Sequence, residues 1–137
     1  MLLNISLIQL LSLKRYSKLL KPEGKIIILT PNTQSIAHCL FGFYWRGLEP
    51  PRHIHLFNSN NLKVCLQKSG FLALEQKSFS ADSHKIYLWG FIQKYHAESL
   101  YDYLLALLFQ CEEFRSKKIC EADGEDLFLV AQKINIL

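Results

Sequence analysis

The sequence has no glycine-rich loop, because its six glycines are isolated from one another. Loops that cradle a nucleotide phosphate need closely spaced glycines, so we expect no such cradle in this chain. The four cysteines, at positions 39, 65, 111 and 120, form no C-x-x-C pair. This spacing argues against a zinc ribbon or a thioredoxin-like redox site, and it is typical of reduced thiols in a cytoplasmic protein.

Blocks of like charge and long apolar runs are also missing. The net charge is +4 over 137 residues and is spread along the chain, so no nucleic-acid partner is indicated. The apolar start has no basic region before it and no small-residue cleavage site, which argues against a signal peptide. The run that begins at Leu104 and ends at Phe109 is too short to span a bilayer. We expect it to be buried against the sheet or a partner, with weak contact to a membrane surface as the alternative.

Half of the residues are hydrophobic, which is enough for one core, and we expect a single domain over residues 1–137. Apolar spacing predicts a helix over residues 5–20, ended by Pro22 and Gly24. The continuous apolar run from Lys25 to Thr30 predicts a strand that is buried on both faces, as in a parallel sheet.

The rest of the chain predicts alternating helices and strands. We expect a short helix over residues 35–44, a helix capped within residues 58–61, a strand over 72–80, a helical hairpin within 86–117 and a last strand over 126–133. This order is typical of an α/β fold.

One loop, residues 41–57, gathers most of the side chains that could do chemistry. It reads FGFYWRGLEPPRHIHLF, and its adjacent prolines exclude a helix or a central strand. Its candidate functional residues are Trp45, Arg46, Glu49, Arg52, His53 and His55. Loops with several such side chains often line a site, although this loop could also be a packed connection between two elements.

The motifs LLKPEG, IIILTPNT and FGFYWRGLEPPRHIHLF, in this order, resemble the C-terminal half of class I S-adenosylmethionine-dependent methyltransferases. The first motif is shared by many of these enzymes. The WRGLEPPRHIHLF block is much more specific and is similar to that of a bacterial branch of the family. The ending GEDLFLVAQK resembles the last strand of the family.

The resemblance implies a partial Rossmann-like sheet with flanking helices. Family sheets run in the order 3-2-1-4-5-7-6, and the last strand is antiparallel. The chain would then carry the fifth strand, from Lys25 to Thr30, beside the seventh, over residues 126–133, and the sixth, over residues 72–80, at the outer edge.

The cofactor-binding half of the family has no counterpart in this sequence. That half carries a glycine-rich turn after the first strand and an acidic residue after the second. On the order of 100 residues of the expected domain are therefore absent. S-adenosylmethionine is the cofactor that the family implies, but no cofactor-binding residue can be transferred to this chain, and we do not expect the chain alone to bind it.

In the family, the loop after the fifth strand shapes the acceptor side of the pocket. Methyl transfer often needs a base, and histidine suits this role because its unperturbed pKa is about 6.5. His53 and His55 are the catalytic candidates, and in an extended segment both would face one pocket. The alternatives are that they fix the loop through backbone hydrogen bonds, or bind a metal together with His38.

Five residues are candidates for substrate binding. Arg46 and Arg52 could hold an anionic group, and Glu49 could pair with either of them. Trp45 could stack on substrate or pack in the core. Asn32 lies where doubly wound folds place ligand contacts, and it could equally be a turn residue.

The strand from Lys25 to Thr30 is expected to have an unpaired edge, which invites a second copy or a complementing chain. Two functions follow. The first is the C-terminal portion of a methyltransferase that acts on a small-molecule or lipid- or sugar-linked acceptor and is inactive alone. The second is a non-catalytic interaction module that associates through this edge.

Overall fold

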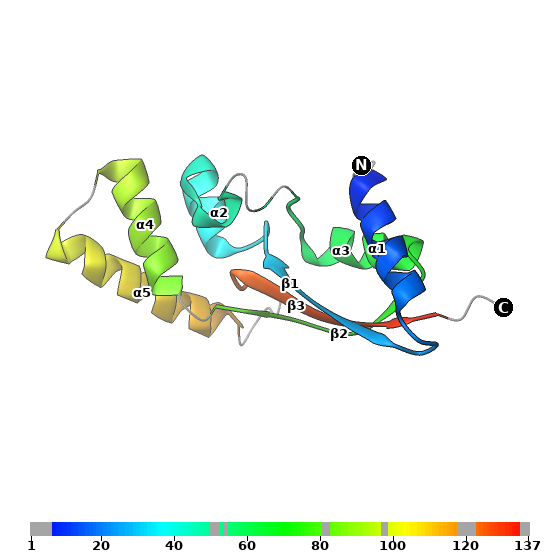
Figure 1. The fold of residues 1–137 in the computed structure, drawn as a ribbon. Helices are drawn as coiled ribbons and strands as arrows, with labels where there is room; N and C mark the ends of the chain where they lie inside the picture. The colour runs from blue at the N-terminus through cyan, green and yellow to red at the C-terminus, as the bar shows by residue number, and fades with distance from the viewer. Residues whose placement is uncertain are drawn as a thin grey trace.

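The computed structural model describes residues 7–49, 53, 55–80, 83–96, 99–117 and 123–134. Along the chain it contains α1 (Leu7–Leu19), β1 (Lys25–Pro31), α2 (Ile36–Phe41), two 3-10 turns (Gly42–Tyr44 and Arg46–Leu48), α3 (Ser59–Lys68), β2 (Phe71–Phe79), α4 (Ser83–Tyr95), α5 (Leu100–Lys117) and β3 (Asp126–Lys133). The strands form one sheet, with α1 and α3 over one face and the α4–α5 pair beyond one end (Figure 1).

The sheet has the strand order β1-β3-β2, and both pairings are antiparallel. Ile28 lies opposite Leu129 on one side of β3, and Ala73 lies opposite Ala131 on the other side. The α/β class and the central place of the last strand are confirmed. The parallel sheet suggested by the apolar run alone is wrong for the described strands, because β3 runs against both neighbours.

The two faces of β1 differ in burial. Ile26 and Ile28 pack against the core beneath α1 and α3, whereas the side chains of Ile27 and Leu29 are 67% and 61% exposed. The prediction that β1 is buried on both faces is therefore wrong. The physical reason is that the helices packed on this sheet lie on one face, so alternate side chains of β1 face outward.

The sheet core is aliphatic except for one phenylalanine. Its buried members are Leu62, Leu66, Phe71, Leu127, Leu129 and Ala131. The residues that β3 contributes are two apart, as a half-buried strand requires. Helix α3 begins with the predicted cap, in which the Asn58 side chain accepts from the Asn61 amide at 2.8 Å and the Asn61 side chain accepts from the Asn58 amide at 2.7 Å.

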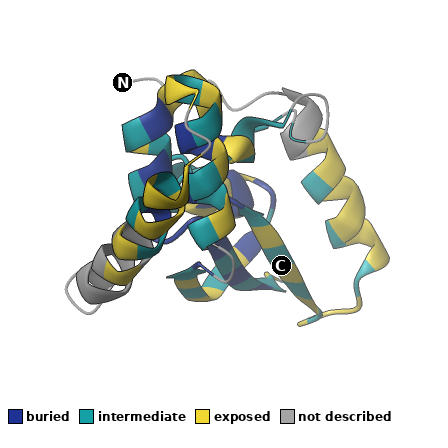
Figure 2. Cartoon of the chain, turned by 90° about the vertical axis from the view of Figure 1, so that its left-hand side faces the viewer, coloured by how far each residue is buried: buried dark blue, intermediate teal, exposed yellow. Residues whose placement is uncertain are grey.

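A second core lies between α2, α4 and α5 and is rich in aromatic rings. Phe41 meets Tyr87 at 5.9 Å and Phe91 at 5.2 Å between ring centroids, both edge-on. A Cβ atom at Gly90 would lie 2.4 Å from the Phe41 ring, so the helices approach this closely only because residue 90 is glycine. The predicted helical hairpin is confirmed. Figure 2 shows buried residues where the elements meet and exposed ones along the outlying helices.

The apolar run in α5 is divided between core and surface. Ala106 is buried and Leu105 packs against the aromatic core, while Leu104 and Leu108 are 50% and 61% exposed. No helix among the described residues is both long enough and apolar enough to cross a membrane. Contact of this run with a membrane surface stays a prediction.

Candidate functional site

The site begins where β1 ends, at a turn fixed by Asn32. The fully buried Asn32 side chain donates to the Gly124 carbonyl at 2.7 Å and accepts from the Gln34 amide at 3.0 Å. Its backbone N–H donates to the Glu125 carbonyl at 2.8 Å. Asn32 thus ties the end of β1 to the start of β3, as the turn alternative proposed. Its contact with substrate stays a prediction.

The loop that follows α2 returns to the same place. The Thr33 backbone N–H and hydroxyl both donate to the Phe57 carbonyl, at 2.8 and 3.1 Å. Asn32 and Phe57 also form an isolated parallel bridge. Because residues 32 and 33 are joined to Phe57, the described side chains of the segment between them lie near the end of β1.

Trp45 is the inward-facing member of this loop. It is 2% exposed, and its indole N–H donates to the Glu125 carboxylate at 2.7 Å. Glu125 is 1% exposed and also accepts from the Ser35 hydroxyl and the Ala37 amide, both at 3.2 Å. These donors offset the cost of burying a charge. The Trp45 ring therefore packs in the core, which was one of the two alternatives, and it also borders two cavities.

A cavity of about 320 Å³ lies beside Trp45, at the joined ends of β1 and β3; we call it the polar cavity. Its lining residues are Pro31, Trp45, Arg46, Gly47, Glu49, His53, Lys85, Ile86, Glu125 and Asp126. The structure thus brings together Trp45, Arg46, Glu49 and His53 of the predicted set. Sequence reasoning missed Lys85, Glu125 and Asp126. Glu125 and Asp126 could have been found from the sequence, because they form an acidic pair at the start of an apolar strand.

The predicted pairing of Glu49 with an arginine is confirmed for Arg46, whose Nε lies 3.0 Å from the Glu49 carboxylate. The Arg46 guanidinium also lies 6.0 Å from the centroid of the Trp89 ring. Partly exposed pairs of this kind add about 0–1 kcal/mol to stability. Their main consequence is that Arg46 is held in place from two sides.

The two histidines do not share a pocket, so the prediction that both face one cavity is wrong. His53 lines the polar cavity, whereas His55 lines a different one. Alternation of side chains needs extended backbone, whereas the chain bends at His55. The His53 amide donates to the Glu49 carbonyl at 3.4 Å. Arg52 and the adjacent prolines lie outside the described residues.

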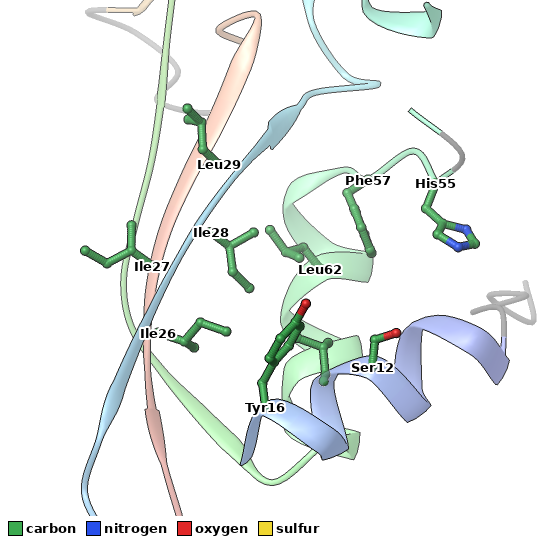
Figure 3. A pocket seen from close by; sticks show the side chains of 10 residues that line it. Ser12, Tyr16, Ile26, Ile27, Ile28, Leu29, His55, Phe57 and Leu62 are labelled. Atoms are coloured by element: carbon green, nitrogen blue, oxygen red, sulfur yellow. The ribbon is translucent and has the colours of Figure 1, made fainter. Parts of the chain in front are cut away.

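The cavity at His55 has a volume of about 470 Å³ and opens along the edge of β1 that no other described strand pairs with; we call it the edge groove. Its lining residues are Ser12, Leu13, Tyr16, Ile26, Ile27, Ile28, Leu29, His55, Phe57 and Leu62. Figure 3 shows Ile26 and Ile28 of β1 facing Leu62 and Phe57, with Ser12 and Tyr16 on α1. Its wall is mainly apolar, in contrast to the polar cavity.

His38, the third histidine of the metal alternative, is engaged elsewhere. Its Nδ1 lies 2.7 Å from the Thr33 carbonyl, and its ring centroid lies 4.6 Å from that of Trp45. Within the described part of the chain, no three His, Cys, Asp or Glu side chains are grouped so that they could hold a metal ion. Burial raises the pKa of the Cys65 thiol, which packs in α3 away from these cavities.

Comparison with known families covers the segment that carries most of the described site residues. A family model described as "Methyltransferase domain" matches residues 9–76, from within α1 to within β2. This segment belongs to the methyltransferase domain family. It is the class I, S-adenosylmethionine-dependent family that the motifs resemble, and its members generally use that cofactor. The match does not extend to the narrower bacterial branch, which stays a prediction. No curated protein matches the chain.

Proposed function

We propose that this chain forms the acceptor side of a class I methyltransferase, acting on a small-molecule or lipid- or sugar-linked acceptor. The observation that carries the proposal is the polar cavity, which gathers Arg46, Glu49 and His53 at the joined strand ends. Most of this wall lies within the segment that matches the family. In α/β sheets, ligands bind in crevices outside strand ends.

Each side chain has a distinct role in this proposal. His53 accepts the proton of the acceptor group, because its imidazole ring lies in the cavity wall and histidine is the most common general base. Arg46, held by Glu49 and Trp89, orients the acceptor without having to be ordered first. Glu125 is a positioning residue, since it fixes the Trp45 ring beside the cavity.

The polar cavity does not offer a complete site for the cofactor. Of the three carboxylates in its wall, Glu49 is paired with Arg46 and Glu125 accepts from Trp45, so a ribose diol at either would compete with these partners. The third, Asp126, is the first residue of β3. We therefore propose that residues 1–137 are the C-terminal portion of a methyltransferase-like domain and are inactive without a cofactor-binding half.

Isothermal titration of the chain with S-adenosylmethionine tests the missing cofactor site. We expect no measurable heat of binding. Micromolar binding by the chain alone would overturn the claim that the cofactor site lies elsewhere. The DNA upstream of Met1 is a second test, because a glycine-rich strand–turn–helix encoded there in any frame identifies the missing half.

The base assignment is tested once that half is supplied, by following labelled methyl transfer into small molecules and lipids of a cell extract. We expect His53→Asn to lower transfer about 100-fold or more. His55→Asn is the matched control, because this residue lines the edge groove. Equal losses in the two variants contradict the role of His53.

A second function, as an interaction module, is supported by the edge of β1. Among the described strands, β1 pairs on one side only. Its free edge borders the edge groove (Figure 3), and Ile27 and Leu29 expose an apolar surface next to it. An added strand from a second copy or a complementing chain would satisfy the edge and cover this surface.

Size-exclusion chromatography with light scattering tests this association. We expect self-association that Ile27→Lys reduces. Leu72→Lys is the control, because Leu72 is also exposed but lies on the opposite edge strand, β2. A stable, monodisperse monomer at all concentrations counts against a second copy as the partner.

A further inference from the structure

Next to the polar cavity lies a second hollow, which we call the aromatic cavity. It has a volume of about 340 Å³, within the range of small-molecule sites. Its lining residues are Phe43, Tyr44, Trp45, Arg46, Leu48, Glu49, Trp89 and Gln93. Trp45, Arg46 and Glu49 line both cavities, so the two hollows are neighbours divided by these side chains.

Three of the four aromatic side chains in the wall of this cavity keep a large exposed surface, whereas the fourth, Trp45, is buried. Trp89 is 46% exposed, Tyr44 is 48% exposed and Phe43 is 95% exposed. They come from separate elements, because Phe43 and Tyr44 belong to the 3-10 turn after α2 and Trp89 belongs to α4. Large rings that converge on a hollow while keeping their surface accessible indicate a ligand that covers them.

The charges in this wall largely cancel. Arg46 and Glu49 form an ion pair, and the guanidinium faces the Trp89 ring. The wall also carries the Gln93 side chain, which is an uncharged amide, and the Tyr44 hydroxyl. A wall of this kind offers little attraction to a charged group, and it favours a neutral one.

We infer that the aromatic cavity binds a neutral aromatic ring, and that this ring is one end of an acceptor whose polar end lies in the polar cavity. An aromatic ring gains offset or edge-on contacts with Trp89 and Tyr44 that a saturated ring of equal size does not. Arg46 and Glu49, at the division between the cavities, then contact the middle of the ligand. This inference rests on the proposed function, because it names the class of acceptor.

The test measures binding without cofactor, so it is independent of methyl transfer. The full chain is titrated with 4-hydroxybenzyl alcohol, with its saturated analogue 4-(hydroxymethyl)cyclohexanol and with methyl β-glucoside. Saturation-transfer NMR detects contact, and calorimetry gives the affinity. We expect the aromatic probe to bind about two- to tenfold more tightly than the saturated one.

Two variants locate the binding. Trp89→Leu should lower the affinity for the aromatic probe several-fold, whereas Tyr101→Leu should leave it unchanged. Tyr101 is 68% exposed on α5 and is not part of the cavity wall. The circular dichroism spectrum and urea midpoint of each variant show whether the fold is kept.

Four results would each overturn the inference. They are equal affinity for the aromatic and saturated probes, tighter binding of the glucoside, no binding of any probe at millimolar concentration, and an equal loss of affinity in both variants. The aromatic probe could bind through Trp89 although the chain supports no methyl transfer when the cofactor half is supplied. That result would support the binding site and contradict the proposed function. Methyl transfer without such binding keeps the function and rejects the aromatic acceptor.

Discussion

The two cores of this protein are built from different residues and have different tasks. The sheet core beneath α1 and α3 is almost wholly aliphatic, whereas the core between α2, α4 and α5 contains Phe41, Trp45, Tyr87 and Phe91. Aliphatic side chains pack densely and hold no polar atom that needs a partner. In the second core, the Trp45 ring borders two cavities and its N–H donates to the buried Glu125 carboxylate. The difference indicates that the first core is scaffold and that the second positions the site.

Leu129→Ala should cause the largest loss, because Leu129 is fully buried at the centre of the sheet core. Removing its branched end leaves a cavity, and we expect the free energy of unfolding to fall by about 2–5 kcal/mol. Urea denaturation followed by circular dichroism measures this. A loss below that of Trp45→Phe would contradict the scaffold role of the sheet core.

Trp45→Phe tests the link between the two cores. Phenylalanine keeps most of the ring but removes the N–H that the buried Glu125 carboxylate accepts at 2.7 Å. We expect a loss of about 1.5–3 kcal/mol in the free energy of unfolding, as for hydrogen bonds to charged groups. Trp89→Phe is the control, since the Trp89 ring is half exposed. Equal losses would mean that the bond to Glu125 contributes little.

Gly90→Ala should affect the aromatic core alone. Alanine favours a helix by about 1 kcal/mol over glycine, but its Cβ would lie 2.4 Å from the Phe41 ring, and overpacking costs about 1–3 kcal/mol. The net expectation is a loss of about 1 kcal/mol. Hydrogen exchange should show faster amide opening in α4 with little change in the sheet. A stabilised variant would show that the contact with Phe41 relaxes without cost.

The smallest effect concerns the cap of α5. The Ser99 hydroxyl and amide donate to the Asp102 carboxylate at 2.6 and 2.9 Å and hold the pKa of that carboxyl below its usual range. Because the pKa of Asp102 is lowered in the folded state, the bonds from Ser99 stabilise the fold at pH values above the unfolded-state pKa. This stabilisation is lost as the pH falls through the folded-state pKa. NMR titration should show the pKa of Asp102 moving upward in Ser99→Ala. An unchanged titration would mean that these bonds do not form in solution.

Much of the fold followed from local patterns in the sequence. The final strand, the cap at Asn58 and the helical hairpin depend on spacing within a few residues, and the structure has them at nearly the predicted positions. The strand order came from the resemblance, because the hydrophobic pattern of a strand does not identify its neighbours. The prediction that β1 is buried on both faces was wrong for a related reason. The sequence shows that Ile27 is apolar, but it does not show whether another element packs against that side chain.

The site was predicted in part. The loop and most of its side chains were identified from residue type, and Arg46, Glu49 and His53 do line one cavity. Lys85 was missed because it reaches the cavity from α4, far along the chain. His55 was misplaced because alternation holds only in extended backbone, and the chain bends at His55.

By itself, the sequence determined the elements of this protein, the family of residues 9–76 and the loop that carries the site. Only the tertiary structure showed that Glu125, next to the first residue of the last strand, accepts from Trp45, and that His53 and His55 line different cavities. The physical reason is the distance along the chain over which each interaction acts. Capping, turn formation and amphipathic spacing act between near neighbours, whereas a cavity wall is made of side chains that only packing brings together.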